Sequence, residues 1–403
     1  MYRTFFSLIL MLISIELSAQ TATRWRGPEG NGIYPDQGLL KQWPADGPEM
    51  VWHYEGIGIG HSSPVIANNR IYVTGMTDTI GSIYVLSMDG KLIDRWEYGV
   101  DFYESWPGTR SSVTIAGDLL YVESGMGGLY CFDIQKGAIR WKKHLFKDFD
   151  GKNIQWGVTE TVVVDGDVLY CTPGGATNNV IALNRHNGNL IWSSPGNGEL
   201  SAYCTPLLIN LPSRKLLVTM TAGHIIGLDA EDGKMLWKHP QTNQYSVHAN
   251  TPIYHDGAVF CFSGYRQGGP KLRLSPDGSS VTQEWFAQTM DSRMGGAVLV
   301  NGYLYGSGDI SGKEWQCIDW KTGEQKYKSR EAAKGVTIYA DGMLIGYSQR
   351  GELFIAPASP DEFRITGKTQ ITLGSGEHWA HPVLHNGILY LRHGNTLMAY
   401  QLK

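Results

Sequence analysis

The chain has 403 residues, of which 18% are charged, and its formal net charge is −4. Lysines and arginines are scattered along the sequence, which excludes nucleic acid and anionic membrane surfaces as expected partners. Fifty glycines, 13 tryptophans and 21 tyrosines indicate many turns and large aromatic packing units, a composition typical of β-rich proteins.

The first 19 residues, MYRTFFSLILMLISIELSA, predict a cleaved secretory signal peptide. Arg3 supplies the positive end, an apolar run extends from Phe5 to Ile15, and Ser18 and Ala19 are the small residues before the cleavage site. The apolar run is too short to span a bilayer, and no cysteine follows it that could carry a lipid anchor. We therefore expect a periplasmic or secreted protein without stable membrane insertion.

Residues 20–48 include the stretch RWRGPEGNGIYP, whose glycines and prolines predict loop structure. We expect this N-terminal extension to pack across one face of the domain that follows it. That domain covers residues 49–403.

Four segments share one skeleton: an acidic or amide residue, three residues, a glycine, three more residues and an aromatic. They are FDIQKGAIRW at 132–141, LNRHNGNLIW at 183–192, LDAEDGKMLW at 228–237 and IDWKTGEQKY at 318–327. The glycine suits the positive φ of a tight hairpin, and the aromatic falls on the following strand. The closing aromatic recurs at intervals of 42 to 51 residues, which suits one four-stranded propeller blade per unit. We expect its ring to fill the space between neighbouring blades.

A second element, a polar turn followed by an alternating apolar strand, occurs eight times. The copies are NNRIYVTG, GDLLYVES, GDVLYCTP, SRKLLVTM, DGAVFCFS, NGYLYGSG, DGMLIGYS and NGILYLRH. Each unit therefore predicts four strands joined by turns and loops.

The two ends of the domain predict how the ring closes. The eighth unit reaches the C-terminus after three strands, whereas the strand-like segment EMVWHYE at 49–55 precedes the first unit. Pairing this segment with the last three strands leaves no free sheet edge. The sequence thus predicts an all-β, eight-bladed propeller of four-stranded antiparallel blades. A seven-bladed ring stays open, because the last hairpin of the segment 335–373 lacks the glycine-to-tryptophan spacing.

The repeat resembles the pyrroloquinoline-quinone-type (PQQ-like) β-propeller repeat. Blades of that family carry an apolar strand, an Asp, a Gly turn and a Trp, as Asp133, Gly137 and Trp141 do here. The resemblance covers nearly all of the mature chain, and the chain length and the opening WRGPEGNG are similar to the stand-alone secreted propellers related to BamB. The resemblance implies the fold, whereas activity differs among proteins that share it.

The quinoprotein alcohol dehydrogenases of this fold offer a cofactor alternative. Many of them carry two adjacent cysteines near the quinone, whereas no two of the five cysteines here are adjacent. Their calcium-binding Glu and Asn and their catalytic Asp cannot be matched to positions in this chain. We therefore expect no PQQ, no calcium and no other metal. The odd number of cysteines and their apolar surroundings predict buried free thiols.

Candidate site residues follow from an alignment of the eight first strands, because in a propeller these strands line the axis. One ring at their starting ends contains His61, Arg110, Thr159, Tyr203, Ala249, Met294, Lys334 and Trp379. The position before this ring contributes His248, Arg293 and His378, the next one inward contributes Glu160, and His381 lies one step deeper. Trp106 belongs to a connector on the same face. This concentration of cations predicts a site for an anionic ligand such as a uronic acid, a sulfated sugar or a peptide carboxylate.

The leading hypothesis is a monomeric binding or scaffolding module for an acidic glycan or a protein partner. Its ligand-binding candidates are His61, Trp106, Arg110, Tyr203, His248, Arg293, Lys334, His378, Trp379 and His381. A structural role in holding water and inner-strand backbone groups is the alternative for each of them. The alternative function is an enzyme in the axial funnel, either a carbohydrate lyase or hydrolase or a quinone-dependent dehydrogenase. In the first case, Glu160 with His61 or His248 would form the general acid/base pair.

Overall fold

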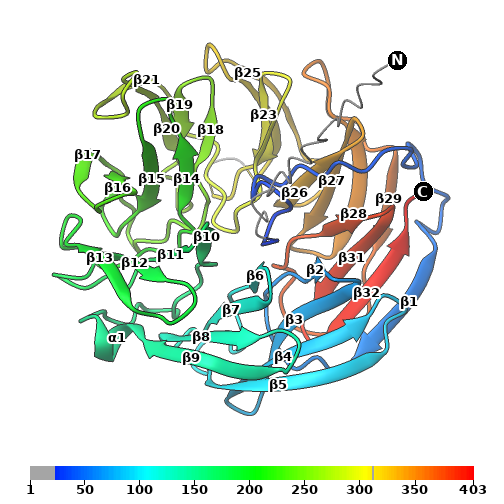
Figure 1. Ribbon diagram of the computed structural model, residues 1–403. Coiled ribbons are helices and arrows are strands. Elements are labelled where there is room, and N and C mark those ends of the chain that lie inside the picture. The colour runs from blue at the N-terminus through cyan, green and yellow to red at the C-terminus, as the bar shows by residue number, and fades with distance from the viewer. Residues whose placement is uncertain (1–22, 311–312) are drawn as a thin grey trace, which may run out of the picture.

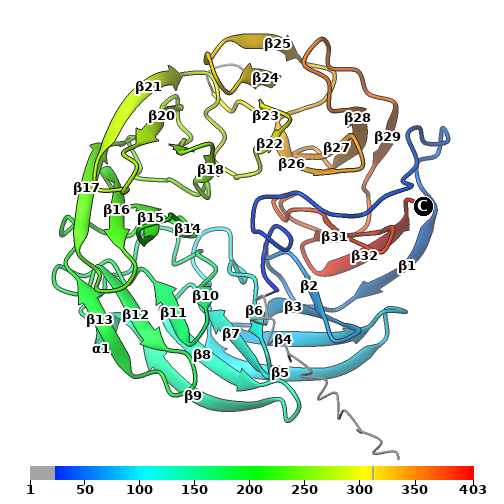
Figure 2. The same cartoon turned by 45° about the horizontal axis from the view of Figure 1, so that its top comes forward.

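The structure is a computed structural model that describes residues 23–310 and 313–403. Eight four-stranded antiparallel sheets are arranged as blades around a central axis (Figures 1 and 2). The predicted eight-bladed propeller is confirmed, and the seven-bladed alternative is wrong because the segment 335–373 forms a complete blade. The predicted signal peptide lies outside the described residues.

The blades are numbered in chain order. Blades 1 and 2 contain β2 (Val65–Ala67), β3 (Arg70–Thr77), β4 (Ile80–Ser87), β5 (Leu92–Val100), β6 (Thr114–Ala116), β7 (Leu119–Glu123), β8 (Gly128–Asp133) and β9 (Ala138–His144). Blades 3 and 4 contain β10 (Val163–Asp165), β11 (Val168–Cys171), β12 (Val180–Asn184), β13 (Leu190–Ser194), β14 (Leu207–Asn210), β15 (Lys215–Met220), β16 (His224–Asp229) and β17 (Met235–Pro240).

The second half of the ring continues the pattern. Blades 5 and 6 contain β18 (Ile253–His255), β19 (Ala258–Phe260), β20 (Gly269–Leu274), β21 (Val281–Ala287), β22 (Val298–Val300), β23 (Tyr303–Ser307), β24 (Trp315–Asp319) and β25 (Gln325–Ser329). Blades 7 and 8 contain β26 (Gly335–Ala340), β27 (Met343–Ser348), β28 (Glu352–Pro357), β29 (Gly367–Gln370), β30 (Val383–His385), β31 (Ile388–His393), β32 (Thr396–Gln401) and β1 (Met50–Glu55).

Strand β1 completes blade 8 by pairing antiparallel with β32. Trp52 lies opposite Ala399, and Tyr54 lies opposite Leu397. The N-terminal and C-terminal strands therefore share one sheet, drawn in blue and red in Figure 1, as the sequence predicted.

The repeated Asp-Gly-Trp skeleton forms contacts between neighbouring blades. Trp237 on β17 of blade 4 is 7% exposed, and its Nε1 donates to the carbonyl of Gly278 in blade 5 at 3.1 Å. The turn glycine of blade 4, Gly233, has a φ of 76°, and a Cβ there would approach Trp192 of blade 3 to 2.4 Å. The skeleton thus needs a glycine both for the turn and for the ring that packs on it. The same contact recurs between Gly137 and Trp96, Gly188 and Trp141, and Gly323 and Trp285.

The hydrophobic core lies between the blades, and it contains the cysteines. One cluster joins Cys204 and Trp237 of blade 4 to Leu272 and Leu274 of blade 5. All five cysteines are free and buried, which confirms the predicted buried thiols. The one described helix is the single turn α1 (Leu145–Asp148). No helix within residues 23–310 and 313–403 is both long and apolar enough to cross a membrane.

Residues 23–33, here called the N-terminal strap, cross the axis of the ring. Thr23 exchanges two backbone hydrogen bonds with Ile115 of β6 in blade 2, at 2.8 and 2.9 Å. Arg26 Nη2 donates to the carbonyl of Ala297, just before blade 6, at 2.6 Å. Ile33 forms a bridge with Tyr339 in β26 of blade 7. The dark blue chain in Figure 2 then continues from the centre of the ring to its rim.

Candidate functional site

A cavity of about 530 Å³, here called the axial funnel, lies at the end of the axis where the first strands begin. Connectors that lead into seven of the eight blades contribute to its walls. Of the predicted ligand-binding residues, the funnel is lined by His61, Trp106, Arg110, Tyr203, Arg293, Trp379 and His381. The structure thus brings together seven of the ten candidates.

His248, Lys334 and His378 do not line the funnel. At the two histidines the side chain points away from the wall that the next residue lines, as neighbours on an extended chain do, whereas Arg293 at the same position of blade 6 lines the funnel. His248 precedes the lining residue Ala249, and His378 precedes the lining residue Trp379. The residues that line the funnel below the predicted ring accordingly follow it by two positions, as Ser63, Ser112, Thr161, Thr205 and His381 do.

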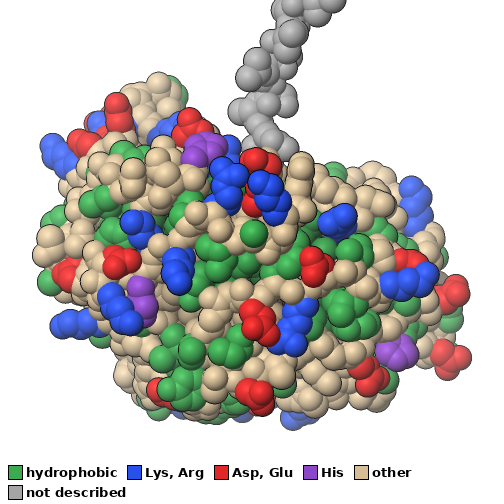
Figure 3. Space-filling model, turned by 60° about the horizontal axis from the view of Figure 1, so that its bottom comes forward, with side chains coloured by type: hydrophobic (Ala, Val, Ile, Leu, Met, Phe, Trp, Pro, Cys, Tyr) green, Lys and Arg blue, Asp and Glu red, His purple; other side chains and the backbone are tan. Residues whose placement is uncertain are grey.

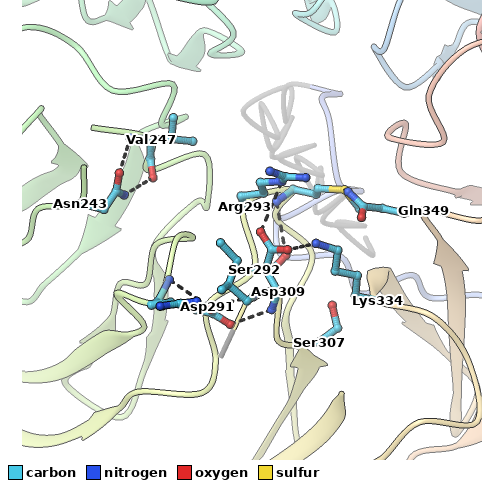
Figure 4. A network of polar contacts seen from close by, with 12 residues as sticks. Asn243, Val247, Asp291, Ser292, Arg293, Ser307, Asp309, Lys334 and Gln349 are labelled. Atoms are coloured by element: carbon cyan, nitrogen blue, oxygen red, sulfur yellow. Dashed lines mark hydrogen bonds and ion pairs between the residues drawn. The ribbon is translucent and has the colours of Figure 1, made fainter. Parts of the chain in front are cut away.

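The three residues off the funnel wall make contacts within the protein. His248 is fully buried, and its Nε2 lies 3.2 Å from the carbonyl of Ala222. His378 stacks on His393 with ring centroids 3.7 Å apart. Lys334 forms an ion pair with the buried Asp309, whose Oδ2 is also 3.3 Å from Arg293 Nε. Figure 4 shows Arg293 and Lys334 converging on Asp309. Burial and the charge of Arg293 lower the pKa of Lys334 to about 8.

Two groups of aromatic side chains form the funnel walls. On the side of blades 8, 1 and 2, the Trp379 ring lies 4.8 Å from His61 and 6.4 Å from Trp106. On the side of blades 3 to 5, Trp156 lies 6.2 Å from Tyr203, and Tyr265 also lines the wall.

Three of these aromatic residues have backbones in the left-handed region. The φ angles are 49° at Trp106, 70° at Tyr203 and 59° at Tyr265. A bulky residue rarely adopts a positive φ, and such strain gathers at functional sites. Three aromatic residues of the funnel wall therefore have a strained backbone conformation, which marks the wall as a candidate functional site.

Two buried arginines, Arg26 and Arg392, and the half-buried Arg110 lie around the funnel, and within the described ranges none of them forms an ion pair with a carboxylate. Arg110 Nη2 donates to the carbonyls of Ser105 and Trp106 at 3.2 and 2.9 Å, whereas its Nε has no partner among the described residues. Arg392 donates to Ser62 Oγ at 2.7 Å and to four backbone carbonyls, those of Gly58, Ser62, Thr74 and Gly394. Arg26 contacts His381 Nδ1 at 3.2 Å and backbone carbonyls.

Burial lowers the pKa of these guanidinium groups, but all three remain protonated at neutral pH. The pKa falls to about 10 for Arg26 and Arg110 and to about 9 for Arg392. Burial and the charges of Arg110 and Arg392 also lower the pKa of His61 to about 3, so this imidazole is neutral. The charge of the Asp101 carboxyl raises the pKa of Arg110 and so offsets part of the effect of burial. Asp101 forms no ion pair with Arg110: it is fully buried and accepts hydrogen bonds from Tyr98, Phe102 and Gly125. Of these three arginines Arg110 lines the funnel, and it brings a positive charge without a carboxylate ion-pair partner to the wall.

Glu160 points away from the funnel, into the space between blades 2 and 3. Its Oε1 accepts a hydrogen bond from the Thr172 amide at 2.6 Å, and its Oε2 accepts one from the Thr172 hydroxyl. Glu123 is equally buried and faces Glu160, with which it shares a hydrogen bond when one of the two carboxyls is protonated. Burial raises the pKa of Glu160 to about 7, and burial together with Glu160 raises the pKa of Glu123 further.

This carboxyl pair predicts a stability that falls as the pH rises. Between pH of about 5 and 7, the folded state keeps a proton on Glu160 that the unfolded chain has lost, so the free energy of unfolding decreases. Glu160→Gln is expected to flatten this part of the profile and to raise stability at pH 8 by about 1–3 kcal/mol. Urea unfolding at pH 5 to 8 measures the effect. Glu104→Gln, at an exposed carboxyl, serves as the control, and parallel profiles for wild type and Glu160→Gln would contradict the interpretation.

The wall residues that sequence reasoning missed include Trp25, Trp156, Tyr265, Gln349, Arg350 and Glu377. Trp156 precedes the ring residue Thr159 by three positions, much as Trp106 precedes Arg110 by four, so the shared connector position was a usable signal. Trp25 lies in the strap, whose path across the axis has no counterpart in the repeat.

The comparisons with known proteins agree with this architecture. A family model described as "Outer membrane protein assembly factor BamB" matches residues 81–329, more than half of the chain. The chain belongs to this family of PQQ-like propellers. No curated protein matches the sequence.

Solved structures of other PQQ-like propellers show the same fold. BamB from Moraxella catarrhalis has a TM-score of 0.64 at 14% identity, covering 88% of this chain and 100% of that chain. A europium-containing methanol dehydrogenase has a TM-score of 0.65 at 12% identity and covers 92% and 90%. Quinohemoprotein alcohol dehydrogenase from Comamonas testosteroni has a TM-score of 0.64 at 11% identity and covers 91% and 78%. At these identities the likeness concerns the fold alone.

The described residues do not fit a quinone held with calcium. Calcium binds through several oxygen ligands, and the described part of this PQQ-like propeller contains no cluster of three or more His, Cys, Asp or Glu that could hold a metal ion. Glu377 is the one carboxylate among the described residues of the funnel wall. That the protein carries no quinone and no metal stays a prediction.

Proposed function

We propose that the protein is a binding module whose axial funnel captures an anionic ligand, carried by an acidic glycan or by a protein partner. The observation that carries this proposal is Arg110, a cation on the funnel wall without a carboxylate partner. Keeping an unpaired cation partly buried costs free energy. An oxyanion of the ligand would offset this cost through charge-assisted hydrogen bonds.

The composition of the walls and of the surface supports the same function. The funnel combines ring faces with a few polar groups, as ligand pockets do. On the face drawn in Figure 3, positive and negative side chains are interspersed, so the unpaired cation Arg110 on the funnel wall is a local feature. The family description names an assembly factor, which supports a role in binding.

The enzyme alternative finds less support from the arrangement of its candidate residues. Glu160 bonds to Thr172 and does not line the funnel, and His248 is buried against Ala222 and Ser263. His61 lines the funnel alone among the three. The general acid/base pairs considered from the sequence are therefore not assembled on the wall.

The proposed location follows from the N-terminal sequence. The signal peptide predicted for residues 1–19 would direct the protein to the periplasm or the exterior, where acidic glycans and outer-membrane proteins are available as ligands.

Arg110→Ala tests the proposed function. We expect the wild-type protein to bind at least one class of acidic ligand on an array of uronate, sulfated and neutral glycans and carboxylate-terminated peptides. The variant should bind that ligand about 10- to 100-fold more weakly, because one charge-assisted contact is worth about 1.5–3 kcal/mol. Titration calorimetry measures the change.

Arg364→Ala is the control, because Arg364 is 67% exposed and does not line the funnel. The Arg364→Ala variant should bind the same acidic ligand with the affinity of the wild type. A wild-type protein that binds no acidic ligand, or an Arg110→Ala variant that binds as the wild type does, would refute the function.

A further inference from the structure

The N-terminal strap limits what can enter the axial funnel. Its contacts at Ile115 in blade 2 and Ala297 beside blade 6 lie on opposite sides of a ring of eight blades. These contacts lie on the first strands or beside them, and Trp25 of the strap is itself part of the funnel wall. The strap therefore stands between the funnel and the far end of the axial channel.

The bottom of the funnel is fixed by contacts around this strap. Trp25 packs against the His381 ring at 4.9 Å, and Arg26 contacts His381 Nδ1. His381 Nε2 is 2.9 Å from the carbonyl of Met294. A ligand chain can thus enter from the connector side, but it cannot pass through the ring.

The size of the funnel agrees with a short ligand segment. A volume of about 530 Å³ falls within the range of small-molecule sites, about 300–1,000 Å³. A blind pocket of this size holds the end of a chain, whereas a polymer bound along its length needs an open groove.

The wall around Arg110 carries donors that the protein leaves free. Arg110 Nε and Trp379 Nε1 are buried N–H groups that lack hydrogen-bond partners within the described part of the chain. They lie around the group formed by Trp379, His61 and Trp106. Binding of an oxyanion beside a flat ring would require the Arg110 or Trp379 side chain to turn its buried donor toward the funnel.

This combination suits a sugar that carries a carboxylate. Aromatic faces pack against the C–H face of a pyranose ring, and a planar guanidinium matches a carboxylate in a bidentate arrangement. Hydroxyl side chains line the deeper wall, at Ser63, Ser112, Thr161 and Thr205. The second aromatic wall, at Trp156, Tyr203 and Tyr265, can hold the next ring of the chain.

From this geometry we infer that the funnel recognises the end of a uronate-containing glycan chain, with the terminal carboxylate at Arg110 and the sugar ring packed on the wall that Trp106 and Trp379 form. This inference rests on the proposed function and adds two properties to it, the class of ligand and end-on binding.

Chain-length dependence tests end-on binding. The probes are dimers, trimers and hexamers of galacturonate, glucuronate and mixed mannuronate and guluronate, titrated into the full-length protein by calorimetry. For at least one series, the dissociation constant per chain should stay constant within about threefold from trimer to hexamer, with one protein per chain. Neutral galactose oligomers of the same lengths should bind at least 100-fold more weakly.

Each other result overturns the inference in a recognisable way. Affinity that rises steadily with length, or several proteins on one hexamer, would indicate binding along the chain and leave the proposed function intact. Binding of sulfated sugars or peptide carboxylates without uronates would overturn the ligand class alone. Failure of all acidic probes would overturn the proposed function as well.

Two aromatic variants of one connector supply a matched pair. Trp106 and Tyr103 are 49% and 48% exposed, but only Trp106 lines the funnel. Trp106→Ala should weaken uronate binding five- to tenfold, and Tyr103→Ala should change it less than twofold. Equal effects of the two substitutions would contradict the placement of the sugar ring.

Discussion

Replacement of Trp237 by alanine is expected to lower the free energy of unfolding by about 3–5 kcal/mol. The ring is 7% exposed and lies between blades 4 and 5, in the cluster that contains Leu272 and Leu274. Its removal leaves a cavity and breaks the hydrogen bond of 3.1 Å from the indole Nε1 to the Gly278 carbonyl. Urea unfolding followed by circular dichroism measures the loss.

Leu190→Ala is the matched control for this substitution. Leu190 lies on the outer strand β13 of blade 3, but it is 48% exposed, so its truncation should change stability by less than about 0.5 kcal/mol. A Trp237→Ala variant with the wild-type unfolding midpoint would show that the repeated tryptophan does not hold the blades together.

Arg392→Leu is expected to have an effect of similar size, about 3–5 kcal/mol. The guanidinium extends from β31 of blade 8 into blade 1, where it donates to Ser62, Thr74 and Gly58. Leucine fills part of the volume but removes the side-chain donor of the Gly58 and Gly394 carbonyls and one of the donors at Ser62 Oγ and at the Thr74 carbonyl. The substitution therefore weakens the seam at which the first and last blades meet.

Arg392→Lys separates the loss of charge from the loss of hydrogen bonds. Lysine keeps the positive charge but offers fewer directed donors, so we expect an intermediate loss of stability. Arg364→Leu, at a 67% exposed position, should leave the unfolding midpoint unchanged. If Arg392→Leu and Arg364→Leu unfold at the same urea concentration, the seam does not depend on this side chain.

The fold could be predicted from the sequence because its repeat is short-range. The turn glycine, the alternating strand and the closing aromatic all lie within one blade, as Gly233 and Trp237 do, and the period then gives the ring. Closure was also predictable, because a missing strand at one end matched a surplus strand at the other.

Site residues could be predicted only where they occupy equivalent positions in the repeated blades. The alignment of first strands placed His61, Arg110 and Trp379 on one wall because these positions are equivalent in each blade. It could not place Lys334, because the ion pair with Asp309 depends on a loop outside the repeat. Trp25 was missed for a related reason, since the path of the strap depends on tertiary contacts with Ile115 and Tyr339.

The pairing of β1 with β32 also has a consequence for biosynthesis. Trp52 and Ala399 are joined across nearly the whole polypeptide, and such distant contacts form slowly because a long loop must be closed first. The ring of blades therefore closes only after strand β32 has left the ribosome and paired with β1. Until then, blade 8 lacks a partner strand and offers an open edge for aggregation. A prematurely terminated product would never lose that edge, so ring closure distinguishes complete chains from truncated ones.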